Sequence, residues 1–281
     1  MNRIIGLSLL TVCAFAQQQQ SRTTRHSFSF PAPGETRRIE IDNIWGSIRV
    51  TGYDGTTAEA EVVESVRAES NERAEAARRE VRLDVTQKGN TVLLYVDGPF
   101  RCRCDEGFSS RGWRDRDYRV RYDLTLRVPR DTFLWLRTVN EGEIHVDDTT
   151  GDYDIKNING GVEMNGVSGS GRAYALNKPL KVTFRTNPRS ASYFGSLNGK
   201  VDLYFRPNLS ADFRMKTFNG KIYSDFEMTA LPRLAVREER EGGRRIFRAD
   251  RYTRGRVGAG GIEIELDGFN GEMAIHKLEA Q

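Results

Sequence analysis

Two of the three cysteines, Cys102 and Cys104, lie one residue apart in an arginine-rich segment. A structural zinc site takes four ligands, and the three histidines, His26, His145 and His276, are all distant in sequence. We therefore expect no metal at this pair. In an oxidising compartment we expect a disulfide that staples the loop, although its ring would be small and strained. A redox role for the two thiols is the alternative.

The segment around these cysteines, residues 98–121, interleaves cationic and aromatic side chains. The residues that we predict as a candidate binding surface are Arg101, Arg103, Arg111, Trp113 and Arg114. Such groups can attract an anionic partner, for example an envelope polysaccharide or lipid headgroups. The alternative is a solvated loop whose arginines pair with local carboxylates. A second arginine-rich segment, 232–257, is also predicted to be a loop inserted into a regular framework.

Motifs of known catalytic sites are absent from the sequence, which contains neither G-x-S-x-G nor H-E-x-x-H. The acidic run 147–154 does not have the ligand spacing of a calcium loop, and the glycines at 258–261 lead into a strand. We predict no catalytic residue, no cofactor and no metal. The alternative is a polysaccharide lyase or hydrolase that uses Asp202, Asp225 and Arg214 on one outer face.

The overall charge is balanced. The 281 residues include 43 Lys and Arg against 39 Asp and Glu, which gives a net charge of +4. A dedicated nucleic-acid binder concentrates its cations on one face, so we expect no nucleic-acid partner. Hydrophobic residues make up 38% and charged residues 29%, which is typical of a globular protein and not of a disordered one.

The N-terminus has the features of a secretory signal. Arg3 precedes an apolar stretch at 4–16 that ends in Ala-Phe-Ala, the small-x-small pattern that signal peptidase needs. The stretch is shorter than the roughly 20 residues that span a bilayer, so we predict a cleaved signal at 1–16 and regard an uncleaved anchor as the alternative. We expect residues 17–37 to be a flexible lead-in. The protein is then exported to the periplasm, the outer surface or the medium.

An Asn-Gly pair followed by alternating apolar residues recurs through the second half of the chain. The residues that we assign to these structural turns are Asn159, Gly160, Asn198, Gly199, Asn219, Gly220, Asn270 and Gly271. The interval from Gly160 to Gly199 is close to twice the interval from Gly199 to Gly220, and it contains a degenerate copy of the motif. The resulting period of about 20 residues leaves room for two short strands and two turns.

The repeat predicts an all-β fold, namely a β-solenoid or β-roll with coils of about 20 residues. Glycine permits left-handed turn conformations, and stacked asparagines form hydrogen-bonded ladders. The alternative is a β-sandwich of hairpins, because Asn-Gly is also a strong hairpin signal. One short helix is expected at 72–80, after Ser70, packed on an edge or end of the sheet. We predict a single domain at 38–281, interrupted by the two inserted loops.

The repeats at 196–203 and 217–226, and the segment 256–261 that leads to 268–273, resemble the bacterial "putative adhesin" family. This family consists of exported β-solenoid domains related to the auto-transporter adhesin head domain. The resemblance covers about 38–281 without the two insertions. It implies an envelope-associated protein with a role in surface attachment or scaffolding, and it supplies no catalytic residues. The cysteine-containing insertion departs from the family pattern.

Overall fold

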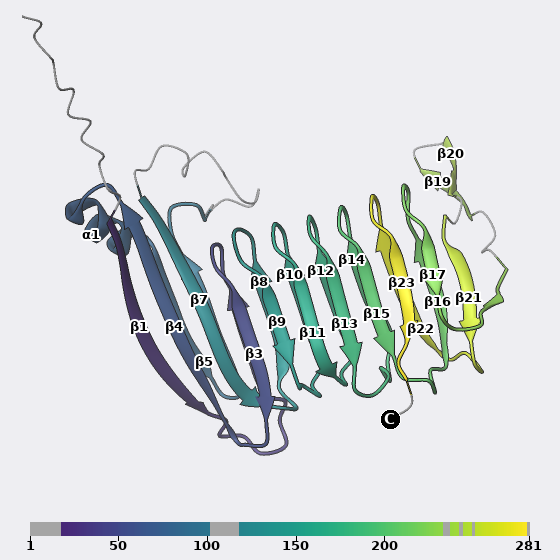
Figure 1. Cartoon of the computed structure of the whole chain (residues 1–281), viewed down its shortest axis with the longest axis horizontal. Coiled ribbons are helices and arrows are strands. Elements are labelled where there is room, and N and C mark those ends of the chain that lie inside the picture. The colour runs from purple at the N-terminus through teal and green to yellow at the C-terminus, as the bar shows by residue number, and fades with distance from the viewer. Residues whose placement is uncertain (1–17, 102–117, 233–236, 242–243, 249–250, 280–281) are drawn as a thin grey trace, which may run out of the picture.

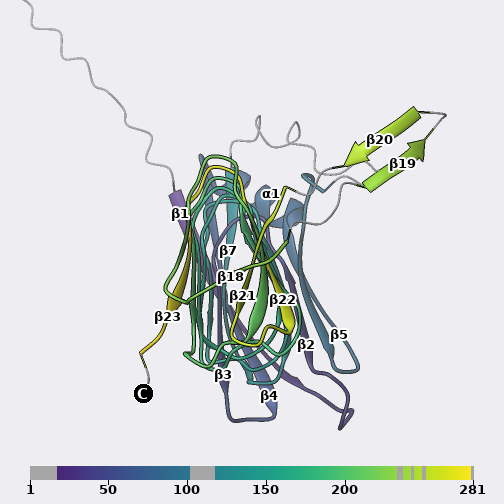
Figure 2. The same cartoon turned by 90° about the vertical axis from the view of Figure 1, so that its right-hand side faces the viewer.

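The chain forms two large mixed β-sheets that face each other, with one short helix at one end (Figures 1 and 2). The computed structural model describes residues 18–101, 118–232, 237–241, 244–248 and 251–279. In spatial order, sheet A contains β1 (Gln18–Ser29), β4 (Thr57–Ala68), β7 (Tyr118–Pro129), β3 (Ile48–Tyr53), β9 (Ile144–Asp147), β11 (Val162–Val167), β13 (Leu180–Phe184), β15 (Val201–Phe205), β23 (Met273–Lys277) and β17 (Ile222–Ser224).

Sheet B contains the remaining strands apart from β19 and β20. In spatial order these are β18 (Thr229–Ala230), β21 (Thr253–Val257), β16 (Ala211–Lys216), β22 (Ile262–Gly268), β14 (Ser192–Ser196), β12 (Gly171–Ala175), β10 (Tyr153–Asn157), β8 (Phe133–Thr138), β2 (Arg38–Asp42), β6 (Thr91–Asp97) and β5 (Arg82–Lys88). A separate hairpin, β19 (Arg237–Glu241) and β20 (Arg244–Arg248), projects from the stack (Figure 2). Over the described ranges, the prediction of an all-β protein with one helix is confirmed.

From β8 to β15 the chain places consecutive strands alternately in sheet B and sheet A, and each strand pairs in parallel with the one two steps along the chain. Met164, for example, lies between Val146 and Val182 in sheet A. Each repeat therefore contributes one strand to each sheet. A chain of Asn-Gly hairpins would instead make consecutive strands antiparallel neighbours, so that alternative is wrong for β8–β15.

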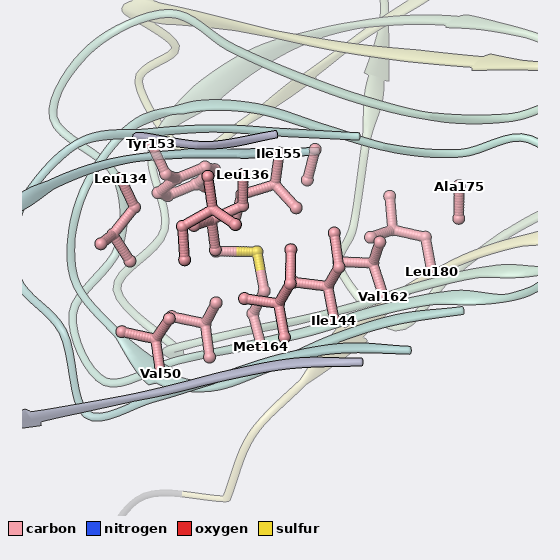
Figure 3. Close-up of a cluster of buried hydrophobic side chains, with 14 of the residues drawn as sticks. Val50, Leu134, Leu136, Ile144, Tyr153, Ile155, Val162, Met164, Ala175 and Leu180 are labelled. Carbon is pink, nitrogen blue, oxygen red and sulfur yellow. The ribbon is translucent and has the colours of Figure 1, made fainter. Parts of the chain in front are cut away.

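The core lies between the two sheets. Strands in both sheets alternate buried and partly exposed residues, because successive side chains point to opposite faces of a strand. Leu136 and Ile155 from sheet B meet Ile144 and Met164 from sheet A, and all four are fully buried (Figure 3). Burying a side chain of this kind stabilises the fold by about 1.5–3 kcal/mol.

Chain order and spatial order differ at the C-terminal end of the stack. β22 lies between β14 and β16, and β23 lies between β15 and β17. Met273 accordingly pairs with Val201 on one side and with Ile222 on the other. We call two consecutive strands, one in sheet B and the next in sheet A, a coil. The last coil of the chain, β22 and β23, is therefore inserted between two coils that precede it in sequence.

The helix α1 (Asn71–Glu80) begins where the sequence predicts it. The hydroxyl of Ser70 accepts a hydrogen bond from the backbone N–H of Arg73 at 3.2 Å, which caps the helix. Ala74 and Ala77 are buried, and the helix packs against β4 and β7 at the N-terminal end of the stack.

The flexible lead-in predicted for 17–37 is wrong over Gln18–Ser29. This segment is the edge strand β1, and it pairs with β4 along its whole length. An edge strand is covered on one side only, so most side chains of β1 remain exposed and its sequence has no strong apolar alternation. The backbone hydrogen bonds to β4, which a polar sequence does not reveal, hold it in the sheet.

The two predicted insertions are shorter than expected. Within 98–121, residues 118–121 belong to β7, where outward-facing Arg119 and Arg121 alternate with buried residues. Within 232–257, Thr253–Val257 forms β21 in sheet B. The predicted signal at 1–16 lies outside the described residues. In the ranges that the structure covers, no helix is long and apolar enough to cross a membrane.

Candidate functional site

The four Asn-Gly turns, together with the turns at Asn140 and Asn177, stack along one edge of the molecule and form a continuous amide ladder. In each step an asparagine Nδ2 donates to the Oδ1 of the asparagine in the adjoining coil, at 2.7–2.8 Å. The ladder runs through Asn140, Asn159, Asn177, Asn198, Asn270 and Asn219. The amides thus bond to one another across successive coils.

The glycines of these turns have a different role from the one expected. Gly160, Gly199, Gly220 and Gly271 do not have positive φ angles. A Cβ at any of them would instead clash with a backbone oxygen of the adjoining coil. The close approach of neighbouring coils therefore requires glycine, and the left-handed conformation that we expected at these turns is not what selects it.

Arg101 is the one member of the candidate surface in 98–121 that the structure describes. Its guanidinium pairs with Asp42 at 3.0 Å, donates to the Val96 carbonyl at 3.0 Å and lies 4.4 Å from the ring centroid of Tyr95. These contacts tie the end of β6 to β2. The other four residues of that surface, Arg103, Arg111, Trp113 and Arg114, lie outside the described residues, as do Cys102 and Cys104.

The three candidate catalytic residues do not form one site. Asp202 and Asp225 bond to opposite nitrogens of His276, at 3.2 and 3.3 Å, on the outer face of sheet A. Arg214 lies on sheet B, where it pairs with Glu265 at 3.0 Å. Because both carboxylates contact the same imidazole, the arrangement joins β15, β23 and the end of β17. Within the described ranges, no cluster of His, Cys, Asp and Glu could hold a metal ion.

The outer face of sheet B carries aromatic side chains with cations beside them. Arg137 lies 4.4 Å from the Trp135 ring centroid, and Arg38 lies 4.2 Å from that of Phe133. At the other end of the sheet, Arg214 lies 3.8 Å from the Tyr252 centroid. The outward positions of these strands therefore form a mixed aromatic and cationic surface.

Four residues in the middle of this face, which we name the central patch, are Lys156, Arg172, Tyr174 and Tyr193. Lys156 is the register neighbour of Tyr174, and Arg172 is the register neighbour of Tyr193. Arg172 lies 4.4 Å from the Tyr193 ring centroid. The two tyrosine rings lie 6.5 Å apart between centroids and are tilted by 32°.

The two cations of the central patch differ from most others on sheet B. Arg137 pairs with Asp154 at 2.9 Å and Lys216 pairs with Asp267 at 3.1 Å. Lys156 and Arg172 are exposed, and neither has a carboxylate oxygen within 4.0 Å in the part of the chain that the structure describes. Their positive charges are therefore available to an anionic ligand.

The phenols of the central patch remain protonated. Burial raises the pKa of Tyr193 well above its ordinary value, and the nearby carboxylate of Asp267 adds to the effect. The charge of Arg172 acts in the opposite direction. Burial and Asp267 also raise the pKa of Tyr174. Both hydroxyl groups are thus able to donate a hydrogen bond to an anionic ligand at neutral pH.

Gly195 provides the space over which the two tyrosines lie. A Cβ at this position would be 2.9 Å from the Tyr174 ring, 2.9 Å from the Tyr193 hydroxyl oxygen and 2.8 Å from the backbone oxygen of Asp267. The glycine is buried and is the register neighbour of Tyr174. Its lack of a side chain lets the two rings approach each other above the sheet.

The sequence contains one signal for this patch that the prediction did not use. Arg172, Tyr174 and Tyr193 occupy outward positions on strands whose alternate residues are buried. Aromatic residues at outward positions of two neighbouring coils indicate an interaction surface.

No known protein-family model matches this sequence, and no characterised protein matches it significantly. The fold is similar to that of a "putative cell adhesion protein" from Clostridium sporogenes, with a TM-score of 0.45 and 11% identity over 92% of this chain and 100% of the other. A "putative adhesin" from Bacteroides fragilis gives a TM-score of 0.37 and 12% identity over 92% and 97% of the two chains.

Proposed function

We propose that this protein is an exported, non-catalytic surface-binding domain that binds an acidic polysaccharide through the central patch of sheet B. The observation that carries the proposal is that Lys156 and Arg172, beside the rings of Tyr174 and Tyr193, have no carboxylate partner among the described residues. The predicted signal at 1–16 and the resemblance to bacterial adhesins support the exported, adhesin-like role.

The ligand class follows from the chemistry of the patch. A guanidinium binds a carboxylate through two parallel hydrogen bonds, and an ammonium supplies a second positive charge. The aromatic carbons provide an apolar surface for the C–H face of a sugar ring. A uronic acid presents both features, namely a carboxylate and an apolar ring face. A neutral sugar satisfies only the aromatic part.

The architecture suits a ligand with a repeating structure. We propose that the stacked coils form a β-solenoid, in which successive strands lie about 4.8 Å apart. The stack places side chains of successive coils in rows across sheet B, such as Asp154, Arg172 and Tyr193. A linear polysaccharide can contact several members of such a row at once.

Binding of polygalacturonate, measured by titration calorimetry on the chain from residue 17 onward, tests this function. We expect binding to polygalacturonate and much weaker binding to dextran, a neutral polysaccharide. The double variant Lys156→Gln and Arg172→Gln should lower the affinity at least tenfold. Arg49→Gln, which removes an exposed arginine on sheet A, serves as the matched control. Equal affinity of the double variant and the parent would refute the central patch as the site.

A further inference from the structure

Exposed large hydrophobic side chains gather at one corner of the molecule. Among the described residues they are Leu197, Phe218, Tyr223 and Phe269, with exposed fractions of 37%, 70%, 47% and 43%. Leu197, Phe218 and Phe269 each directly precede the asparagine of an Asn-Gly turn. We name these three residues the apolar ridge. A phenylalanine ring as exposed as that of Phe218 is costly in water unless something covers it.

The apolar ridge is ordered by the stacking of the coils. The backbone N–H of Asn270 donates to the Leu197 carbonyl at 2.8 Å, and that of Asn219 donates to the Phe269 carbonyl at 2.7 Å. The rings of Phe218 and Phe269 stack at 4.9 Å between centroids, with 5° between their planes. The ridge therefore runs Leu197, Phe269, Phe218 along the edge of the stack, beside the amide ladder.

Lysines lie in two turns of the ridge, at Lys200 and Lys221, and in the adjoining turn beside Leu197, at Lys178. Lys178, Lys200 and Lys221 are exposed, and the one acidic residue among the corresponding turn positions of these coils is Glu272. Lys200 pairs with Asp202 at 3.0 Å, whereas Lys178 and Lys221 have no carboxylate oxygen within 4.0 Å in the described ranges. Glu272 accepts a long hydrogen bond of 3.5 Å from the Tyr223 hydroxyl. The surroundings of the ridge are thus predominantly cationic.

We propose that the apolar ridge inserts into the surface of an anionic lipid bilayer. The ridge lies on turns at the edge of the stack, where its side chains can enter the headgroup region while the sheets remain outside. Phenylalanine and leucine partition into the interfacial region, and lysines beside them are attracted to anionic headgroups. This combination of exposed aromatic rings and unpaired lysines distinguishes a lipid surface from a neutral apolar partner.

The proposal concerns a different face of the molecule from the central patch and does not depend on polysaccharide binding. Substitutions at Lys156 and Arg172 should leave lipid binding unchanged, and substitutions in the ridge should leave polysaccharide binding unchanged. The two functions can therefore fail separately.

A single tryptophan substitution gives a direct readout of insertion. In Phe218→Trp, vesicles of phosphatidylcholine mixed with phosphatidylglycerol, an anionic lipid, should shift the added emission to shorter wavelength, and brominated lipid should quench it. The parent chain supplies the background from its own tryptophans. An unchanged spectrum, with no co-flotation of the protein with these vesicles, would overturn the proposal.

Further variants separate the apolar and cationic contributions in the same flotation assay. Phe218→Ser with Phe269→Ser should reduce vesicle binding at least tenfold. Lys178→Glu with Lys221→Glu should reduce it by at least about 25-fold, since each neutralised lysine is worth roughly fivefold near an anionic surface. Lys88→Glu, at the exposed end of β5 on the opposite edge of sheet B, should have little effect. Equal binding of the parent to pure phosphatidylcholine vesicles would overturn the anionic specificity.

Discussion

The guanidinium of Arg172 lies 4.4 Å from the centroid of the Tyr193 ring, on the adjoining strand of sheet B. On the other side of Arg172, its register neighbour Asp154 forms an ion pair with Arg137. Arg172 is therefore held in place by an aromatic ring and not by a carboxylate. This contact positions a cation without neutralising it, which is the property that an anion-binding surface requires.

The ring of Tyr193 is expected to contribute to binding alongside the two cations. Tyr193→Leu removes the cation–π contact, so Arg172 loses its fixed position and the ligand loses an aromatic surface. We expect the affinity for polygalacturonate to fall about fivefold to tenfold in calorimetry. Tyr204→Leu removes a tyrosine from the outer face of sheet A and is the control. Equal losses in both variants would contradict a role for Tyr193 in the site.

Gly195 gives a second test of the same geometry. In Gly195→Ala the new methyl group would meet Tyr174, Tyr193 and the backbone of Asp267 at 2.8–2.9 Å. We expect the free energy of unfolding to fall by about 1–3 kcal/mol, as for other overpacking changes, together with weaker polygalacturonate binding. Thermal unfolding and calorimetry measure the two effects.

Gly161→Ala is the matched control, because its nearest atom would be the Pro179 oxygen at 3.3 Å. A Gly195→Ala protein as stable as this control, with unchanged binding, would show that the tyrosines do not depend on the glycine.

Much of the architecture could be predicted because inward and outward residues alternate with the repeat. Ile144 and Val146, for example, are buried at alternate positions of β9, and the adjoining coils repeat the pattern. The order of the last coils could not be predicted, because Asn198, Asn219 and Asn270 all lie in equivalent Asn-Gly turns. Any of these coils could stack on any other, so the sequence does not reveal that β22 and β23 are inserted.

The central patch was harder to predict for a similar reason. Tyr174 and Tyr193 belong to different coils, and only the stacking of β12 on β14 brings their ring centroids to 6.5 Å. The local density of arginines instead favoured 98–121. Arg101 from that segment is tied to Asp42, which shows that a cation-rich sequence does not by itself identify free charge.

The amide ladder should contribute to stability in proportion to the hydrogen bonds that each asparagine makes. The side chain of Asn198 donates to Asn177 and accepts from Asn270, whereas the side chain of Asn219, at the end of the ladder, bonds to Asn270 alone among the described residues. At about 0.5–1.5 kcal/mol per hydrogen bond, Asn198→Ala should cost about 1–3 kcal/mol and Asn219→Ala about half as much. Urea unfolding measures both values. Equal losses for the two variants would indicate that the ladder does not act through its side-chain bonds.

The pair formed by Asp212 and Arg256 should make stability depend on acid pH. Arg256 on β21 bonds to both carboxylate oxygens of Asp212 on β16, at 2.6 and 2.9 Å, and holds the pKa of that carboxyl below its usual value. A carboxyl whose pKa is lower in the folded state binds protons more readily when unfolded. Its contribution is therefore fully present above the unfolded pKa, near 3.9, and is lost as the pH falls through the folded pKa.

Asp212→Asn removes this contribution at every pH. We expect the melting temperature of the variant to be lower than that of the parent at pH 7, and the difference between them to shrink as the pH falls below about 4. Thermal unfolding from pH 7 to pH 2 measures this. Asp84→Asn, which removes an exposed carboxylate on β5, serves as the control substitution. A constant difference between Asp212→Asn and the parent across the range would show that the pair does not titrate as its geometry implies.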